Sequence, residues 1–162
     1  MFNLKGITSK CFVHRVECLL VGLTFVKVPN QDYKLFFSIY PLWRPTLKSC
    51  IDLPLLLLPL VDDNDIDIYL SDSTNIIEKC STQFPLLSGS NTAADFVRVL
   101  YGIIATDKSI QTNFILQMKI YELIYGVALY LNNIDIAQDV YIHISNQISG
   151  WDTKIFNYWV RR

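Results

Sequence analysis

The segment 53–77, LPLLLLPLVDDNDIDIYLSDSTNII, constrains the fold of this chain more than any other. It passes from nine apolar residues, 53–61, to four aspartates within six positions, 62–67. An apolar run this short is typical of a buried strand, since a membrane span needs about 20 residues. We therefore expect a strand over 55–58, a turn over 62–65 and an antiparallel return over 66–69.

The two prolines of this run and the hydroxyl residues after it predict further features of the local structure. A proline just before a core strand removes a hydrogen bond from the sheet and often sits in a cis peptide bond, so we expect one before Pro54 or Pro59. Ser71 and Ser73 are both suited to cap a following helix. The inward face of that helix is expected to consist of Ile76, Ile77, Cys80 and Phe84.

The first part of the chain shows a helical spacing between short strand-like runs. Phe12, Val16, Leu19 and Leu23 recur at the period of one helix face, and Gly22 stands where a helix would stop. Residues 24–28 and 2–7 resemble strands, so the pattern predicts a parallel strand–helix–strand crossover. Residues 34–40 alternate weakly, like another strand. We expect residues 1–85 to form a four-stranded sheet with helices on both faces.

A cluster of turn formers, PLLSGSN over residues 85–91, marks the expected boundary between two parts of the chain. Beyond it helical periods dominate, beginning with a capping box over 92–95 and continuing with a second one near Asp135. The fold class is therefore α/β followed by all-α. We assign residues 1–85 to the first part and 86–162 to a helical part without strands.

Composition and charge narrow the class of protein. With 162 residues, 51% of them hydrophobic, the chain can bury a large core. Residues 1–50 carry seven basic residues against two acids, whereas residues 51–100 carry eight acids against two basic residues. This pattern lacks the basic stripe of a nucleic-acid-binding protein, so we expect no direct nucleic-acid contact. We also expect no membrane span and no secretory signal.

The four cysteines stand without any Cys-x-x-Cys pair. They are expected to be buried thiols, which favours a reducing compartment and a cytoplasmic location. Residues 1–16 are basic and free of acid, which makes a mitochondrial location the alternative. Asp63, Asp65 and Asp67 lack the glycine and glutamate of a calcium loop, and a Cys11–His14 pair lacks a second half. We expect no metal site and no bound cofactor.

Several motifs together resemble the glutathione-transferase fold. SKCFVHRV (9–16) and LLVGLTFV (19–26) are similar to its first strand, loop, helix and second strand. LPLVDD (58–63), DSTNII (72–77), QFP (83–85) and the terminal WVRR (159–162) are similar to later segments of the family. The resemblance implies a thioredoxin-like half followed by a small helical half. Lys10 stands where the family usually has proline.

The resemblance also implies site residues, each with a simpler interpretation. Ser9 would hydrogen-bond the glutathione sulfur, or Cys11 would supply a thiolate; otherwise they are a loop serine and a buried thiol. Pro59, Asp72 and Ser73 would hold the γ-glutamyl carboxylate of glutathione, although plain helix capping uses the last two equally well.

The helical part, only 77 residues long, is short for the wall of a second-substrate pocket. Compact versions of the fold occur as scaffold subunits of the multi-tRNA-synthetase complex and as domains appended to synthetases. The resemblance therefore implies a non-catalytic protein-interaction module that binds similar domains or complex subunits, or a second copy of itself. The expected anchors are aromatic: Tyr121, Tyr125, Trp151 and Trp159. The alternatives are a glutathione transferase acting on small electrophiles and a metaxin-like component of mitochondrial import.

Overall fold

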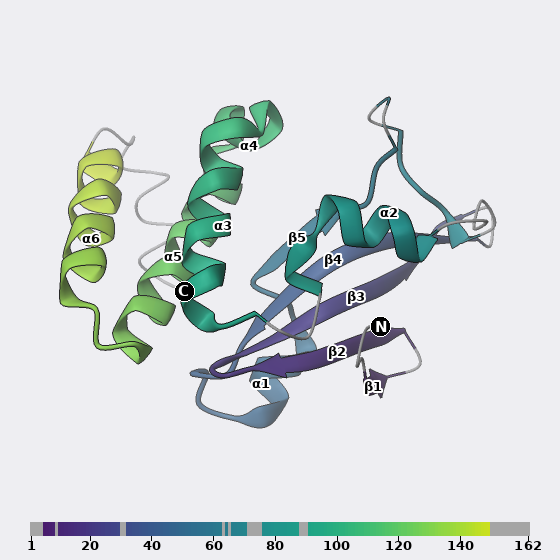
Figure 1. Cartoon of the computed structure of the whole chain (residues 1–162), viewed down its shortest axis with the longest axis horizontal. Coiled ribbons are helices and arrows are strands. Elements are labelled where there is room, and N and C mark those ends of the chain that lie inside the picture. The colour runs from purple at the N-terminus through teal and green to yellow at the C-terminus, as the bar shows by residue number, and fades with distance from the viewer. Residues whose placement is uncertain are drawn as a thin grey trace.

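The computed structural model describes residues 5–8, 10–29, 32–62, 64, 66–70, 76–87 and 91–149. A β-sheet built from the first part of the chain is followed by a group of helices (Figure 1). The expected order, a sheet first and helices afterwards, is confirmed. Residues 91–149 contain helices and turns but no strand, as expected.

The sheet has five strands rather than the expected four, in sequential order and with every neighbour antiparallel. They are β1 (Lys5–Thr8), β2 (Cys11–Val16), β3 (Leu19–Lys27), β4 (Tyr33–Pro41) and β5 (Leu56–Pro59). The strand over 34–40 is confirmed within β4. The predicted parallel crossover is wrong, because β2 and β3 form a hairpin with a turn at Glu17 and Cys18.

The error has a geometric cause. In a hairpin that turns at residues 17 and 18, the pairs Phe12–Leu23, His14–Val21 and Val16–Leu19 place six side chains on one face. The four apolar residues whose spacing predicts a helix are a subset of those six. Glu17 has a φ of 50°, a left-handed conformation that forms the turn and ends β2.

The strand expected over 55–58 is confirmed, shifted by one residue, as β5. The peptide bonds before Pro54 and Pro59 are both trans, so the expected cis bond is wrong. Proline is accommodated here because β5 is an edge strand of the sheet, where an outward-facing position needs no N–H donor. Beyond β5 the chain folds back through an antiparallel bridge between Val61 and Asp67, and Asp67 pairs with Lys34 of β4.

Seven helical segments accompany the sheet in the described residues: α1 (Leu47–Asp52), α2 (Ile76–Gln83), the 3-10 turn η2 (Pro85–Leu87), α3 (Ala93–Thr106), α4 (Lys108–Thr112), α5 (Phe114–Tyr130) and α6 (Ile134–Ser149). Side-chain caps determine where several of them begin. Thr92 and Asp95 form the predicted capping box of α3, whereas Asn133 caps α6 one residue before its first turn. None of these helices is long and apolar enough to cross a membrane.

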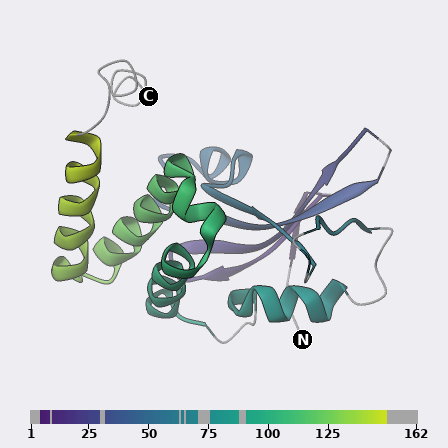
Figure 2. The same cartoon turned by 90° about the horizontal axis from the view of Figure 1, so that it is seen from above.

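The main core lies between one face of the sheet and the helices. Leu19, Val21, Leu35 and Phe37 from the sheet pack with Phe96, Leu100, Leu123 and Ile124 from α3 and α5. The rings of Phe37 and Phe84 stack with centroids 4.3 Å apart, which holds the end of α2 on β4. In the view from above, α2 runs along this side of the sheet and α6 is the outermost helix (Figure 2). The sheet and the helical part therefore share one core.

Candidate functional site

Ser9, Asp72, Ser73, Trp151 and Trp159 lie outside the described residues. Cys11 begins β2 and is 5% exposed, on the sheet face opposite the main core. It therefore occupies a strand and not the start of a helix, where the helix dipole would stabilise a thiolate. Pro59 lies at the sheet edge beside a cleft described below.

A small polar cluster surrounds Cys11. Its sulfur lies 3.1 Å from the Tyr40 hydroxyl, and Thr24 Oγ1 is 2.9 Å from both Tyr40 Oη and Ser38 Oγ. Burial raises the pKa of Tyr40 to about 12. The four groups satisfy each other across β2, β3 and β4, so the arrangement stabilises the sheet and leaves no thiol at the surface.

The remaining cysteines support the expectation of buried thiols. Cys18, Cys50 and Cys80 are buried and, like Cys11, form no disulfide. Burial raises the pKa of both Cys18 and Cys80 to about 11, which keeps them protonated. Among the described residues, no group of three or more His, Cys, Asp or Glu side chains is placed to hold a metal ion.

Tyr121 lies inside the helical part rather than on its surface. It is 7% exposed, and its ring centroid is 4.4 Å from that of His143 in α6. Burial raises the pKa of Tyr121 and Tyr101, and the Asp139 carboxylate raises both further. Gln147 contacts the His143 ring at 3.0 Å. These side chains attach α6 to the rest of the helical part, so Tyr121 serves packing; Tyr125 is half-buried beside it.

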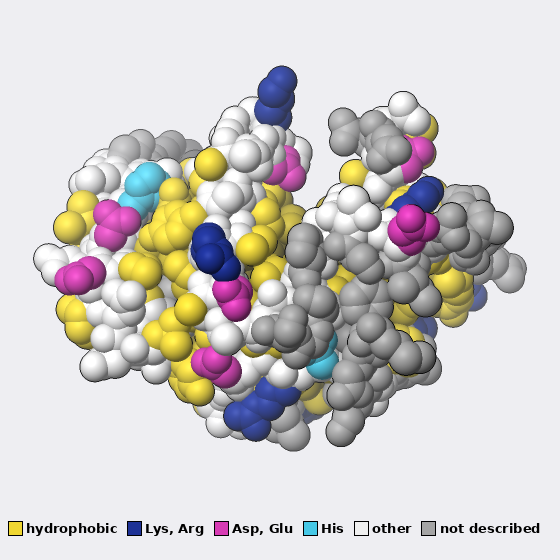
Figure 3. All heavy atoms as spheres, in the orientation of Figure 1, with side chains coloured by type: hydrophobic (Ala, Val, Ile, Leu, Met, Phe, Trp, Pro, Cys, Tyr) yellow, Lys and Arg dark blue, Asp and Glu magenta, His cyan; other side chains and the backbone are white. Residues whose placement is uncertain are grey.

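Exposed apolar side chains gather instead at the turn between α5 and α6 and along the outer face of α6. We call this set the α6 surface; its members are Leu129, Tyr130, Leu131, Ile134, Tyr141 and Ile142. Tyr141 is 62% exposed and Ile134 58% exposed. Ile134, Tyr141 and Ile142 follow the i, i+7, i+8 spacing of one helix face. The space-filling view shows further hydrophobic side chains between α6 and α3 (Figure 3).

The charge of α6 is one-sided. It carries Asp135 and Asp139, both exposed, and contains no lysine or arginine. The α6 surface therefore combines a row of apolar side chains with acidic neighbours. Apolar side chains that gather on a protein surface are a feature of binding faces.

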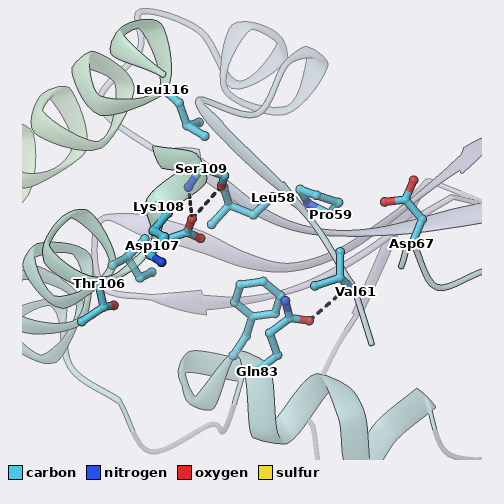
Figure 4. A pocket seen from close by; sticks show the side chains of 12 residues that line it. Leu58, Pro59, Val61, Asp67, Gln83, Thr106, Asp107, Lys108, Ser109 and Leu116 are labelled. Carbon is cyan, nitrogen blue, oxygen red and sulfur yellow. Dashed lines mark hydrogen bonds between the residues drawn. The ribbon is translucent and has the colours of Figure 1, made fainter. Parts of the chain in front are cut away.

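A second feature is a cleft at the edge of the sheet, with a volume of about 750 Å³. It opens between β5, the end of α2 and the helices α3 to α5 (Figure 4). Its lining residues are Leu58, Pro59, Val61, Asp67, Gln83, Phe84, Ile103, Thr106, Asp107, Lys108, Ser109 and Leu116. The volume falls in the range typical of small-molecule sites, about 300–1,000 Å³.

Comparison of the chain with protein-family models, curated proteins and solved structures finds no match. The assignment of a function therefore rests on the two surface features just described. Sequence reasoning missed both of them. The spacing of Ile134, Tyr141 and Ile142 was a usable signal for the α6 surface, whereas the cleft joins segments that are far apart along the chain.

Proposed function

We propose that this protein is a protein-interaction module and that the α6 surface binds its partner. The observation that carries the proposal is the set of six large apolar side chains, each at least 37% exposed, on the last two described helices and the turn between them. Exposed apolar residues also occur elsewhere in the described chain, for example Leu53 and Ile66 in loops and Ile115 in α5. Exposed apolar side chains gathered on neighbouring elements favour burial against another protein.

The partner is expected to present an apolar strip bordered by lysine or arginine. Asp135 and Asp139 flank the exposed apolar residues of α6, and basic residues opposite them would increase the rate of association. A helix laid along α6 would meet Ile134, Tyr141 and Ile142 at matching spacing. Subunits of an aminoacyl-tRNA synthetase complex are the partners that the family resemblance suggests. The proposal rests on the α6 surface, since the described sheet lacks the parallel crossover that carried the resemblance.

The test compares two double variants as baits. Ile134→Asp with Tyr141→Asp changes the α6 surface, and Leu53→Asp with Ile66→Asp places the same charges on exposed residues outside it. Proteins that bind wild type and the control but not the α6 variant are expected. Each is then purified, and its affinity for the three chains is measured. An affinity reduced at least about tenfold by the α6 changes alone supports the proposal.

Two results contradict the proposal. One is a purified partner that binds wild type and the α6 variant equally well. The other is protection from hydrogen exchange at a different element when the partner is added, with α6 unchanged. Light scattering of the pure protein separates a self-association from binding to a different chain. Circular dichroism of the variants checks that each remains folded.

A further inference from the structure

The outer face of α6 combines exposed apolar side chains with negative charge. Ile134, Tyr141 and Ile142 are exposed on this helix. Asp135 and Asp139 lie on the same helix, which has no lysine or arginine, and within the described residues neither aspartate forms an ion pair. In the view from above, α6 is the outermost helix (Figure 2). A fitting occupant of this face is therefore apolar and carries positive charge.

A second copy of the α6 surface lacks the charge that this face requires. Two copies that met through α6 would each bring two aspartates and no basic residue from that helix. Acids that are brought together without a basic partner weaken an interface. The charge of α6 therefore argues against self-association of two α6 helices and in favour of a basic segment.

The residues that follow α6 in the sequence have the required composition. Residues 150–162, with the sequence GWDTKIFNYWVRR, lie outside the described part of the structure. They contain three basic residues, Lys154, Arg161 and Arg162, against one acid, Asp152. Their large apolar and aromatic residues are Trp151, Ile155, Phe156, Tyr158, Trp159 and Val160. The segment is thus complementary to α6 in charge and similar to it in apolar content.

The segment is long enough to return to the start of α6. It begins directly after Ser149, the last residue of that helix. A helix of 16 residues is about 24 Å long, whereas the segment spans up to about 43 Å when extended and about 20 Å when helical. In an antiparallel return, its two arginines come to the first half of α6, which contains Asp135 and Asp139.

We propose that residues 150–162 fold back along α6 and cover the α6 surface of the same chain. Their aromatic side chains pack on the exposed apolar side chains of α6, and Arg161 and Arg162 lie beside Asp135 and Asp139. Because the segment is joined directly to the helix, its effective concentration at this surface is on the order of millimolar. It therefore competes with a partner of the α6 surface, a consequence that rests on the proposed function.

Trypsin cleavage after Lys154 in the full chain tests whether the segment is bound. Cleavage requires the local backbone to open, so a segment held along α6 is cut slowly. The α6 variant, Ile134→Asp with Tyr141→Asp, is expected to be cut at least about tenfold faster than wild type. The control, Leu53→Asp with Ile66→Asp, is expected to be cut at the wild-type rate. Circular dichroism checks that each chain remains folded.

Substitutions within the segment test the charge pairing independently of changes in α6. The arginine variant, Arg161→Glu with Arg162→Glu, is expected to speed cleavage after Lys154 by at least about tenfold. A free peptide of residues 150–162 with the same two changes is cut in parallel, which corrects for the preference of trypsin itself. A labelled wild-type peptide is expected to bind the arginine variant at least about tenfold more tightly than it binds the wild-type chain, whose α6 surface is already covered.

Binding of a purified partner distinguishes this inference from the proposed function. If the partner requires α6 but Lys154 is cut equally fast in wild type and in the α6 variant, the proposed function stands and the covering segment is wrong. If α6 protects Lys154 and no partner requires that face, the covering segment stands and the proposed function is wrong. If both are correct, the partner binds the arginine variant more tightly than wild type.

Three results overturn the covering segment. The first is an equal rate of cleavage after Lys154 in wild type and in the α6 variant, whether fast or slow. The second is a partner that binds through α6 with the same affinity to wild type and to the arginine variant. The third is protection of Lys154 that disappears on dilution, because the segment then covers a second copy of the chain.

Discussion

The indole ring of Trp43 lies directly over the backbone of α5 at Gly126. A Cβ atom placed on Gly126 would come within 2.4 Å of Cζ2 of that ring. Trp43 belongs to the segment between β4 and α1, so this contact joins the sheet to the helical part. Only a residue without a side chain allows the ring to approach the helix so closely.

Replacing Gly126 with alanine is expected to destabilise the protein despite the better helix propensity of alanine. Propensity alone would stabilise by about 1 kcal/mol, whereas overpacking against the ring costs about 1–3 kcal/mol. Urea unfolding should give a net loss of about 1 kcal/mol, with a change in tryptophan fluorescence. Gly102→Ala is the control, since its Cβ meets nothing within 4 Å, and should stabilise. Stabilisation of similar size in both variants would show that Trp43 does not restrain Gly126.

Gly22 in β3 is expected to tolerate no side chain. Its Cβ would lie 1.9 Å from the Phe12 carbonyl oxygen and 2.7 Å from Cα of Val13, and both atoms belong to the backbone of β2. A backbone cannot move aside as a side-chain end can, so Gly22→Ala is expected to cost about 3 kcal/mol. The free energy of unfolding in urea measures this, and a cost below that of Gly126→Ala would contradict the argument.

His14 is expected to reduce stability in acid. Both ring nitrogens are buried and have no hydrogen-bond partner in the part of the chain that the structure describes, and burial lowers the pKa of this histidine below 6.5. The unfolded chain then binds the proton more tightly than the folded one, so the free energy of unfolding falls as the pH drops below about 6.5. His14→Leu replaces the titratable ring with an apolar side chain and should lessen this fall. An unchanged pH dependence in the variant, measured by urea unfolding, would assign the fall to other groups.

Tyr40 is expected to make the protein sensitive to alkali. Its pKa, raised to about 12 mainly by burial, exceeds the usual value of 10.0. The unfolded chain therefore loses this proton first, and stability falls as the pH rises from 10 toward 12. Tyr40→Phe should cost about 1 kcal/mol at neutral pH, because the hydroxyl bonds to Thr24 and Cys11 are lost. It should also reduce the alkaline fall; a fall equal to that of wild type would contradict this prediction.

The strands and helices were predictable to different degrees. The apolar run over 55–58 predicts β5, and the capping box at Thr92 predicts the start of α3, because both depend on a few neighbouring residues. The hairpin of β2 and β3 was missed, since a turn at Glu17 brings two alternating strands into a pattern that also fits a helix. Pro54 and Pro59 follow trans peptide bonds beside the edge strand β5. The edge position of β5 results from its pairing with β4, which a local sequence pattern does not reveal.

The candidate sites were likewise predictable only where local sequence patterns determine them. Burial of Tyr121 could not be read from its place in a helical stripe, since α5 is apolar on nearly every side and its packing partners come from α3 and α6. The exposed row Ile134, Tyr141 and Ile142 is a local pattern that the sequence contains. Whether such a row faces the core or the solvent depends on where the helix packs.

The sequence by itself determined the order of the sheet and the helical part, the burial of the four cysteines and the capping of α3. Each of these follows from local spacing, side-chain chemistry or overall apolar content. Only the tertiary structure decided the antiparallel pairing, the outward face of α6 and the cleft beside β5. These features depend on contacts between residues far apart in the sequence, such as that of Trp43 with Gly126. Such long-range contacts are determined by the packing of the whole core and not by any one segment.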